Sequence, residues 1–312
     1  MIFTLTPNPS IDRTVMIPEI RFNSVLRSDK VRLDLGGKGF NVSRSLHTFG
    51  IESLAIAWVG GATGKILADG LQGLGIQTDF VWVDQDTRGN TMIIEESGDW
   101  YIKVNEPGQP ISRDAIEQLF NKVKSYAKKG DWWVLSGSLP PDVPVEFYAD
   151  LIDLLKSRGA RVYLDARGEA LHYGCQAVPY LVKPNAEEAS NIVGFEVADQ
   201  EDAKRAALPF LRMGVSFFAL TMGSMGLLLA TQREMVFAKA PKVVAHNTAG
   251  SGDALLAALL YAELYEKDLA EMAAWAVATG AASVETEGVS EFDLGRVQTL
   301  LPEIESQVIN IM

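Results

Sequence analysis

The strongest chemical signal in the sequence is a glycine-flanked turn, Gly250-Ser251-Gly252-Asp253, that leads directly into an apolar helical stretch. The first turn of a helix has free N–H groups and the positive end of the helix dipole, so it forms an anion site. Glycines there let the backbone approach the anion closely. A carboxylate such as Asp253 suits one task at that place, which is taking a proton from an alcohol that attacks a phosphoryl group. Capping alone also favours an aspartate in a first turn, so other residues must decide.

A second glycine-led corner, Gly36-Gly37-Lys38-Gly39-Phe40-Asn41, also precedes an expected helix. It is neither a phosphate-binding P-loop nor a dinucleotide fingerprint. Gly37 indicates close approach of the backbone to a ligand, and the Asn41 amide both donates and accepts hydrogen bonds, as sugar hydroxyls require. A glycine turn followed by a helix cap explains the same residues without any ligand.

Polar residues also follow the ends of expected strands, where α/β proteins bind ligands. Asp12 and Ser138 suit sugar hydroxyls there, although an Asx turn and a proline-rigidified turn account for them equally well. Arg88 is a candidate for a bidentate phosphate contact, and its alternative is a surface ion pair.

Two further corners suit a nucleotide and a metal ion. Asn185 and Glu188 lie three residues apart after a strand, and their oxygens suit Mg²⁺ or its waters, while Lys183 adds a cation for phosphate. A capping box explains the same spacing without a metal. Gly223 and Gly226, after another strand, would let a nucleotide lie against the backbone, or simply form a β-turn.

Short β-branched or aromatic runs alternate with amphipathic helical stretches, which predicts parallel βαβ units with helices on both faces of the sheet. Strands are expected at 2–6, 53–59, 79–83, 132–136, 161–165, 180–183, 217–221 and 227–230. Helices are expected at 39–49, 64–74, 112–128, 145–157, 187–193, 199–213, 251–266 and 269–284.

Two segments break this alternation, at about 11–33 and 88–105. The second resembles a hairpin with its turn at Ser97-Gly98-Asp99. We expect these segments to form a small β-sheet lid over one edge of the main sheet. A decorated surface loop is the alternative.

Composition restricts the partners. The chain has 312 residues, 47% of them hydrophobic, and a net charge of −12. A protein this acidic is not suited to binding nucleic acid or an anionic membrane. An anionic substrate must therefore be held by a few local cations and helix starts. The single cysteine, Cys175, excludes an internal disulfide, which fits the cytoplasm, and neither a signal segment nor a membrane span is expected.

Taken together and in this order, the corners resemble the ribokinase-like (PfkB-type) carbohydrate kinases over essentially the whole chain, and within them the 1-phosphofructokinase and tagatose-6-phosphate kinase branch. The resemblance implies a single domain over residues 1–312, with a central, mostly parallel sheet between helices and a β-sheet lid formed by the two discontinuous segments.

The resemblance also implies roles for the residues above. Asp253 would be the general base, and Gly250, Ser251 and Gly252 would form the anion hole. Mg²⁺ would be organised by Asn185 and Glu188, largely through water. The ATP site would be lined by Lys183, Asn185, Thr221, Gly223 and Gly226. The sugar would be held by Asp12, Gly37, Asn41 and Ser138, and its existing phosphate by Lys38, Arg88 and Asn90.

The implied activity is ATP-dependent phosphorylation of a ketohexose monophosphate, with fructose 1-phosphate at its 6-hydroxyl as first choice and tagatose 6-phosphate as the alternative. A catalytically silent sugar-phosphate sensor on the same fold is a further alternative. The presence of Asp253, the implied general base, argues against it. A nicotinamide oxidoreductase would need a glycine-rich turn where Pro7 and Pro9 stand. At a helix start Asp253 is expected to ionise easily. The lid is expected to join two copies into a homodimer.

Overall fold

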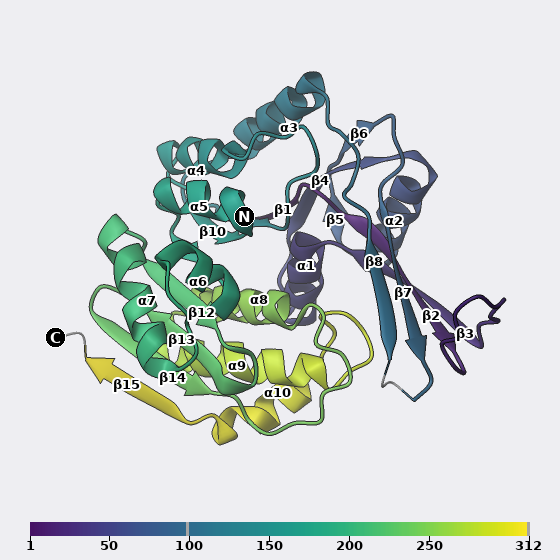
Figure 1. Ribbon diagram of the computed structural model, residues 1–312. Helices are drawn as coiled ribbons and strands as arrows, with labels where there is room; N and C mark the ends of the chain where they lie inside the picture. The colour runs from purple at the N-terminus through teal and green to yellow at the C-terminus, as the bar shows by residue number, and fades with distance from the viewer. Residues whose placement is uncertain (98–99, 311–312) are drawn as a thin grey trace.

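A large β-sheet forms the centre of the structure, a computed structural model that describes residues 1–97 and 100–310 (Figure 1). Its strands are β1 (Ile2–Thr6), β4 (Leu54–Gly60), β5 (Gln77–Thr78), β6 (Val81–Val83), β9 (Trp132–Ser136), β10 (Arg161–Asp165), β11 (Leu181–Val182), β12 (Phe217–Thr221), β13 (Gly226–Ala230), β14 (Glu234–Lys239) and β15 (Ser306–Asn310). Their order is β15-β14-β13-β12-β11-β10-β9-β1-β4-β5, with β6 beside β4.

The sheet is parallel from β12 to β5, and β13, β14 and β15 extend it in antiparallel pairs. The predicted mostly parallel α/β fold is therefore confirmed. Every residue of β1, β4 and β9 is buried, which explains why these strands are continuous apolar runs rather than alternating ones.

Helices cover both faces of the sheet (Figure 1). They are α1 (Lys38–Thr48), α2 (Gly61–Gly73), α3 (Arg113–Tyr126), α4 (Phe147–Ser157), α5 (Gly168–Gln176), α6 (Ala186–Val193), α7 (Gln200–Met213), α8 (Ser251–Leu264), α9 (Leu269–Val284) and α10 (Leu294–Leu300). One face is packed by α3 to α7 and the other by α1, α2, α8 and α9. The α8 helix is apolar on all sides because it lies between α1 and α9. None of the described helices combines the length and the apolar character that a membrane crossing requires.

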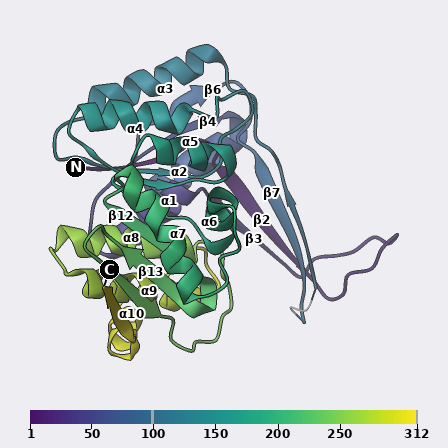
Figure 2. The same cartoon turned by 60° about the vertical axis from the view of Figure 1, so that its left-hand side comes forward.

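A second sheet projects from one edge of the body, as both views show (Figures 1 and 2). It consists of β2 (Ser10–Ile17), β3 (Lys30–Gly36), β7 (Gly89–Glu95) and β8 (Tyr101–Asn105), in the order β3-β2-β7-β8. We call it the lid sheet. The predicted hairpin is confirmed as the antiparallel pair β7 and β8, while Gly98 and Asp99 of its predicted turn lie outside the described residues.

Candidate active site

One large cavity lies where the lid sheet meets the carboxyl ends of the parallel strands. Every site residue predicted from the sequence lines it, although the residues come from corners far apart in the chain. Its volume is about 1540 Å³, more than one drug-sized ligand fills, so two ligands can lie in it side by side.

Asp253 lies in the first turn of α8 and is only 3% exposed. One of its carboxylate oxygens accepts a hydrogen bond of 2.7 Å from the Asn41 amide nitrogen, and the other lies 3.4 Å from the Lys38 amine. The two glycine-led corners of the sequence therefore meet at this carboxylate.

Burial raises the pKa of Asp253 above the ordinary value for an aspartate, although Lys38 partly opposes that rise. The expectation that the helix start would make Asp253 easily ionised is wrong in direction, because desolvation of the carboxylate outweighs the favourable charges around it. A higher pKa makes Asp253 a stronger proton acceptor once it is ionised.

The turn before Asp253 offers backbone donors to an anion. Within the described part of the chain, the N–H groups of Gly250 and Gly252 make no hydrogen bond of their own, whereas the Asp253 N–H is used within the turn. Gly250 has a φ of +77°, and a Cβ on it would lie 2.1 Å from the Ser290 hydroxyl oxygen, so glycine is required there. The Ser290 hydroxyl donates a hydrogen bond of 2.7 Å to the Gly250 carbonyl and thereby stabilises the turn.

The sequence prediction missed Asp165, the last residue of β10, which is 1% exposed. One of its oxygens lies 3.0 Å from the Lys38 amine and 3.2 Å from the Lys183 amine. Burial acts to raise the pKa of Asp165, but the two lysines outweigh it and lower that pKa. A carboxylate at the carboxyl end of a strand in a parallel sheet was the signal that could have identified it.

Arg44 is a second residue that the prediction missed. It lies one helical turn after Asn41 in α1, and its guanidinium donates a hydrogen bond to the Asn41 side-chain oxygen. Because that oxygen is the acceptor, the Asn41 nitrogen must face Asp253. Both ends of the Asn41 amide are thus already engaged, and the predicted contact of Asn41 with a sugar stays a prediction.

The lid contributes a polar corner to the cavity. The Asn90 amide nitrogen donates to Asp12 at 2.7 Å, and the Ser10 hydroxyl donates to the same Asp12 oxygen at 2.7 Å. The bonds from Asn90 and Ser10 orient the Asp12 carboxylate and leave its second oxygen for a hydroxyl group. Nearby in the cavity lining, the Asn8 amide donates to the Ser138 hydroxyl at 3.3 Å.

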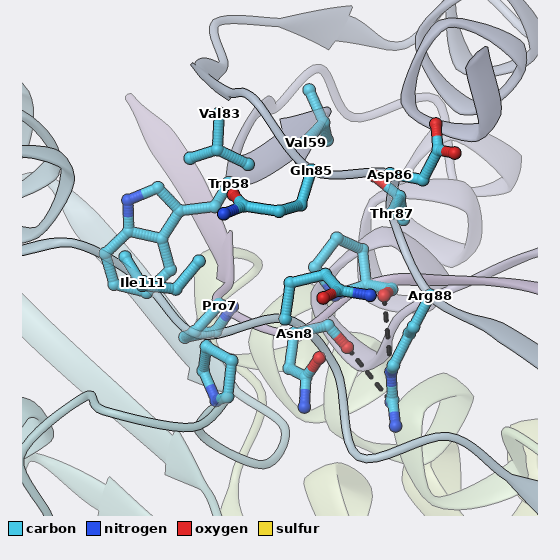
Figure 3. Close-up of a pocket in the computed structure, with 13 residues that line it drawn as sticks. Pro7, Asn8, Trp58, Val59, Val83, Gln85, Asp86, Thr87, Arg88 and Ile111 are labelled. Atoms are coloured by element: carbon cyan, nitrogen blue, oxygen red, sulfur yellow. Dashed lines mark hydrogen bonds between the residues drawn. The ribbon is translucent and has the colours of Figure 1, made fainter. Parts of the chain in front are cut away.

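Arg88 extends along the edge of the cavity, where its guanidinium donates only to backbone carbonyls. These belong to Asn8, at 3.0 Å, Pro9, at 3.3 Å, and Glu106, at 2.7 Å; Figure 3 shows Arg88 and its contact with Asn8. The three bonds fix the guanidinium without neutralising its charge. The Lys38 amine lies 3.0 Å from Asp165 and 3.4 Å from Asp253, and its predicted contact with a phosphate stays a prediction.

On the side of β11 and β12, Asn185 and Glu188 form the capping box that was the alternative to a metal site. The Asn185 oxygen accepts from the Glu188 N–H at 2.8 Å, and Glu188 accepts from the Asn185 N–H at 2.9 Å. Only one Glu188 oxygen is used, so the other is available at the cavity wall. Among the described residues, no group of three or more His, Cys, Asp or Glu side chains could hold a metal.

The chain is similar to known proteins over nearly its whole length. The pfkB family carbohydrate kinase pattern matches residues 6–294. The 1-phosphofructokinase of Bacillus subtilis is 33% identical over 307 residues, covering 98% of this chain and 99% of that one. The D-tagatose-1-phosphate kinase of Klebsiella oxytoca is 30% identical over 305 residues, with 98% and 99% covered.

Solved structures of carbohydrate kinases are also similar to this chain over nearly its whole length. Phosphofructokinase-2 from Escherichia coli in complex with substrates and products superposes with a TM-score of 0.91 at 29% identity, covering 97% of this chain and 98% of that one. A tetrameric inhibited form of that enzyme superposes with a TM-score of 0.89. With a family pattern and relatives that span nearly its whole length, this chain belongs to the pfkB family of carbohydrate kinases.

Proposed function

We propose that this kinase transfers the γ-phosphoryl group of ATP to the 6-hydroxyl of a ketohexose 1-phosphate, with fructose 1-phosphate as the preferred acceptor. The observation that carries the proposal is the buried Asp253 carboxylate, which lies beside free backbone N–H groups in a cavity with room for two ligands. The names of the relatives support the choice of acceptor. The cytoplasm is the proposed location, where a protein with its only cysteine unpaired is stable.

In the proposed reaction a bond forms between the acceptor oxygen and the γ-phosphorus, and the bond from that phosphorus to ADP breaks. Asp253 takes the proton that the hydroxyl releases. The N–H groups of Gly250 and Gly252 and the nearby Lys183 amine would stabilise the charge on the transferred group, since a Cβ on Gly252 would lie 3.4 Å from that amine.

We also propose Mg²⁺ as the metal, held by the available Glu188 oxygen and by waters at Asn185. It would neutralise the charge of the ATP phosphates. Thr221, Gly223 and Gly226 line the same part of the cavity and are the proposed nucleotide contacts.

The decisive experiment is an assay of ADP release with fructose 1-phosphate, tagatose 1-phosphate, tagatose 6-phosphate, fructose 6-phosphate and unphosphorylated fructose. We expect the highest kcat/KM with fructose 1-phosphate and loss of activity when EDTA removes the metal. ADP release with unphosphorylated sugars alone would refute the proposed acceptor.

A second acceptor, tagatose 1-phosphate, is favoured by the full-length similarity to the Klebsiella oxytoca kinase. It carries its phosphate on the same carbon as fructose 1-phosphate and differs in the configuration at one carbon. The same assay ranks the two acceptors, and a higher kcat/KM for tagatose 1-phosphate would reverse our order.

The pH dependence of kcat/KM should report the environment of Asp253. The carboxylate must be ionised to accept a proton, so activity should fall as the pH drops through its raised pKa. Lys38→Met removes a charge that lowers this pKa, and the acid limb of the profile should therefore move to higher pH. An acid limb that stays in place or moves to lower pH would contradict this assignment.

We further propose a homodimer formed through the outer face of the lid sheet. Strand register puts Val15 beside Val31 and Ile93, and Ile93 beside Ile102, so these apolar side chains share one face. The opposite face carries Asp12 and Asn90 and lines the cavity. Several outer-face side chains are exposed, among them Val31, Leu33, Ile102 and Val104. An exposed apolar face of this kind is typical of a protein interface.

Leu33→Glu is expected to dissociate this dimer, because a charge buried against a second apolar face is not compensated. Sedimentation velocity over a range of concentrations measures the change. Ile66→Glu in α2 is the matched control, since Ile66 is 50% exposed but lies outside the lid sheet. A wild-type protein that is monomeric, or a Leu33→Glu variant that associates as strongly as wild type, would exclude this interface.

A further inference from the structure

Arginine is not a residue that helix stability favours at position 167. It is the N-cap residue of α5, has an extended backbone, and makes no side-chain capping bond. Serine, threonine, aspartate or asparagine is preferred at an N-cap, and a cation is unfavourable at the positive end of a helix dipole. Asp165, which pairs with Lys38 and Lys183, lies two residues earlier in the chain.

Arg167 lines the large cavity together with Arg88 and Lys103. In residues 1–97 and 100–310, none of these three cations has a carboxylate within ion-pair distance; Arg88 bonds only to carbonyls. Burial lowers the pKa of Arg88, the charge of Asp12 opposes this, and the charge of Arg167 lowers the pKa further, so the two guanidinium groups are close enough to act on each other. Two guanidinium groups that face one cavity without an ion pair of their own are suited to a ligand that carries more than one negative charge.

We propose that Arg167 and Arg88 together bind the phosphate already present on the acceptor, and that Arg167 is thereby a specificity-determining residue of this chain. The inference rests on the proposed function and adds the residue that selects a phosphorylated sugar. Lys38 is less available for that phosphate because Asp165 and Asp253 engage its amine. Two cations bind a phosphate dianion more strongly than Arg88 alone in a protein with a net charge of −12, and Arg167 is the lining cation whose charge acts on Arg88.

The test is Arg167→Ser, which removes the cation and introduces a preferred N-cap residue. The KM for fructose 1-phosphate should rise about 10- to 100-fold, the scale of a charge-assisted contact, while kcat and the KM for ATP change by less than about threefold. The thermal midpoint should stay equal or rise, because the new side chain can cap α5. If Arg167 had only a structural role, Arg167→Ser would not weaken acceptor binding without also lowering the thermal midpoint.

Two further variants serve as comparison. Arg158→Ala removes the same charge from an exposed residue at the end of α4 that does not line the cavity, and it should leave both KM values unchanged. Arg167→Lys keeps the charge and should recover part of the lost affinity.

A KM for fructose 1-phosphate within about twofold of wild type in Arg167→Ser would overturn the inference, given that a charge-assisted contact is worth at least about tenfold. A rise in the KM for ATP alone would overturn it too, by placing Arg167 at the nucleotide. Failure of the proposed function gives a different result, because the wild-type enzyme would then show no ADP release that depends on a phosphorylated sugar.

Discussion

Asp253→Asn is expected to lower kcat by at least about 100-fold, the usual effect of removing a positioned base. Asparagine has the same shape and can still accept the hydrogen bond from Asn41, so the fold and the nucleotide site should be retained. The KM for ATP should therefore change little. Steady-state kinetics with saturating acceptor and varied ATP measure both quantities.

The matched control for this variant is Asp114→Asn. Asp114 also lies in the first turn of a helix, α3, but it is exposed and does not line the cavity. It should show wild-type turnover. Near-normal kcat in Asp253→Asn would remove Asp253 from the role of base and would favour the simple capping interpretation of this residue.

The second large effect is expected on stability. Asp165→Asn leaves the buried Lys183 and the adjacent Lys38 without their shared carboxylate. Breaking a buried ion pair from one side typically costs about 3–5 kcal/mol of the free energy of unfolding, because the remaining charge stays buried and unpaired. Urea unfolding followed by circular dichroism measures this loss.

Glu201→Gln provides the comparison, because Glu201 pairs with Lys204 on the surface of α7 and should contribute at most about 1 kcal/mol. The sign of the pH dependence follows from the lowered pKa of Asp165. Its contribution to stability is present above the pKa of an unfolded aspartate and is lost as the pH falls through the folded value. Equal stability losses for Asp165→Asn and Glu201→Gln would contradict the importance of the buried network.

The fold could be predicted in its centre because the strands there are short apolar runs buried on both faces. The predicted bounds of β1, β9, β10, β12 and α9 are those of the structure. The helix α5 was missed because Gly168 and Gly174 lie within a nine-residue segment and weaken its helical pattern. The strands β14 and β15 and the helix α10 were also missed, since segments of five to seven residues carry little periodicity.

The site residues could be predicted as a set because glycines and polar residues at strand ends mark a ligand cavity. Their contacts could not, since those depend on which distant side chains meet. Asp165 was counted only as the end of a strand, yet it pairs with two lysines that had been assigned to different ligands. The pKa of Asp253 was predicted in the wrong direction because the sequence gives the helix start but not the depth of burial.

The arrangement of Asp253 has a consequence for regioselectivity. One of its oxygens accepts a hydrogen bond from Asn41, so the acceptor proton passes to the other oxygen, which lies 3.4 Å from the Lys38 amine. If the phosphate of the acceptor is bound at Arg88, the fixed distance between Arg88 and Asp253 determines which hydroxyl group of the acceptor reaches Asp253. A sugar phosphate with several hydroxyl groups would then react at the one whose separation from its own phosphate matches this distance, whatever the reactivity of the others.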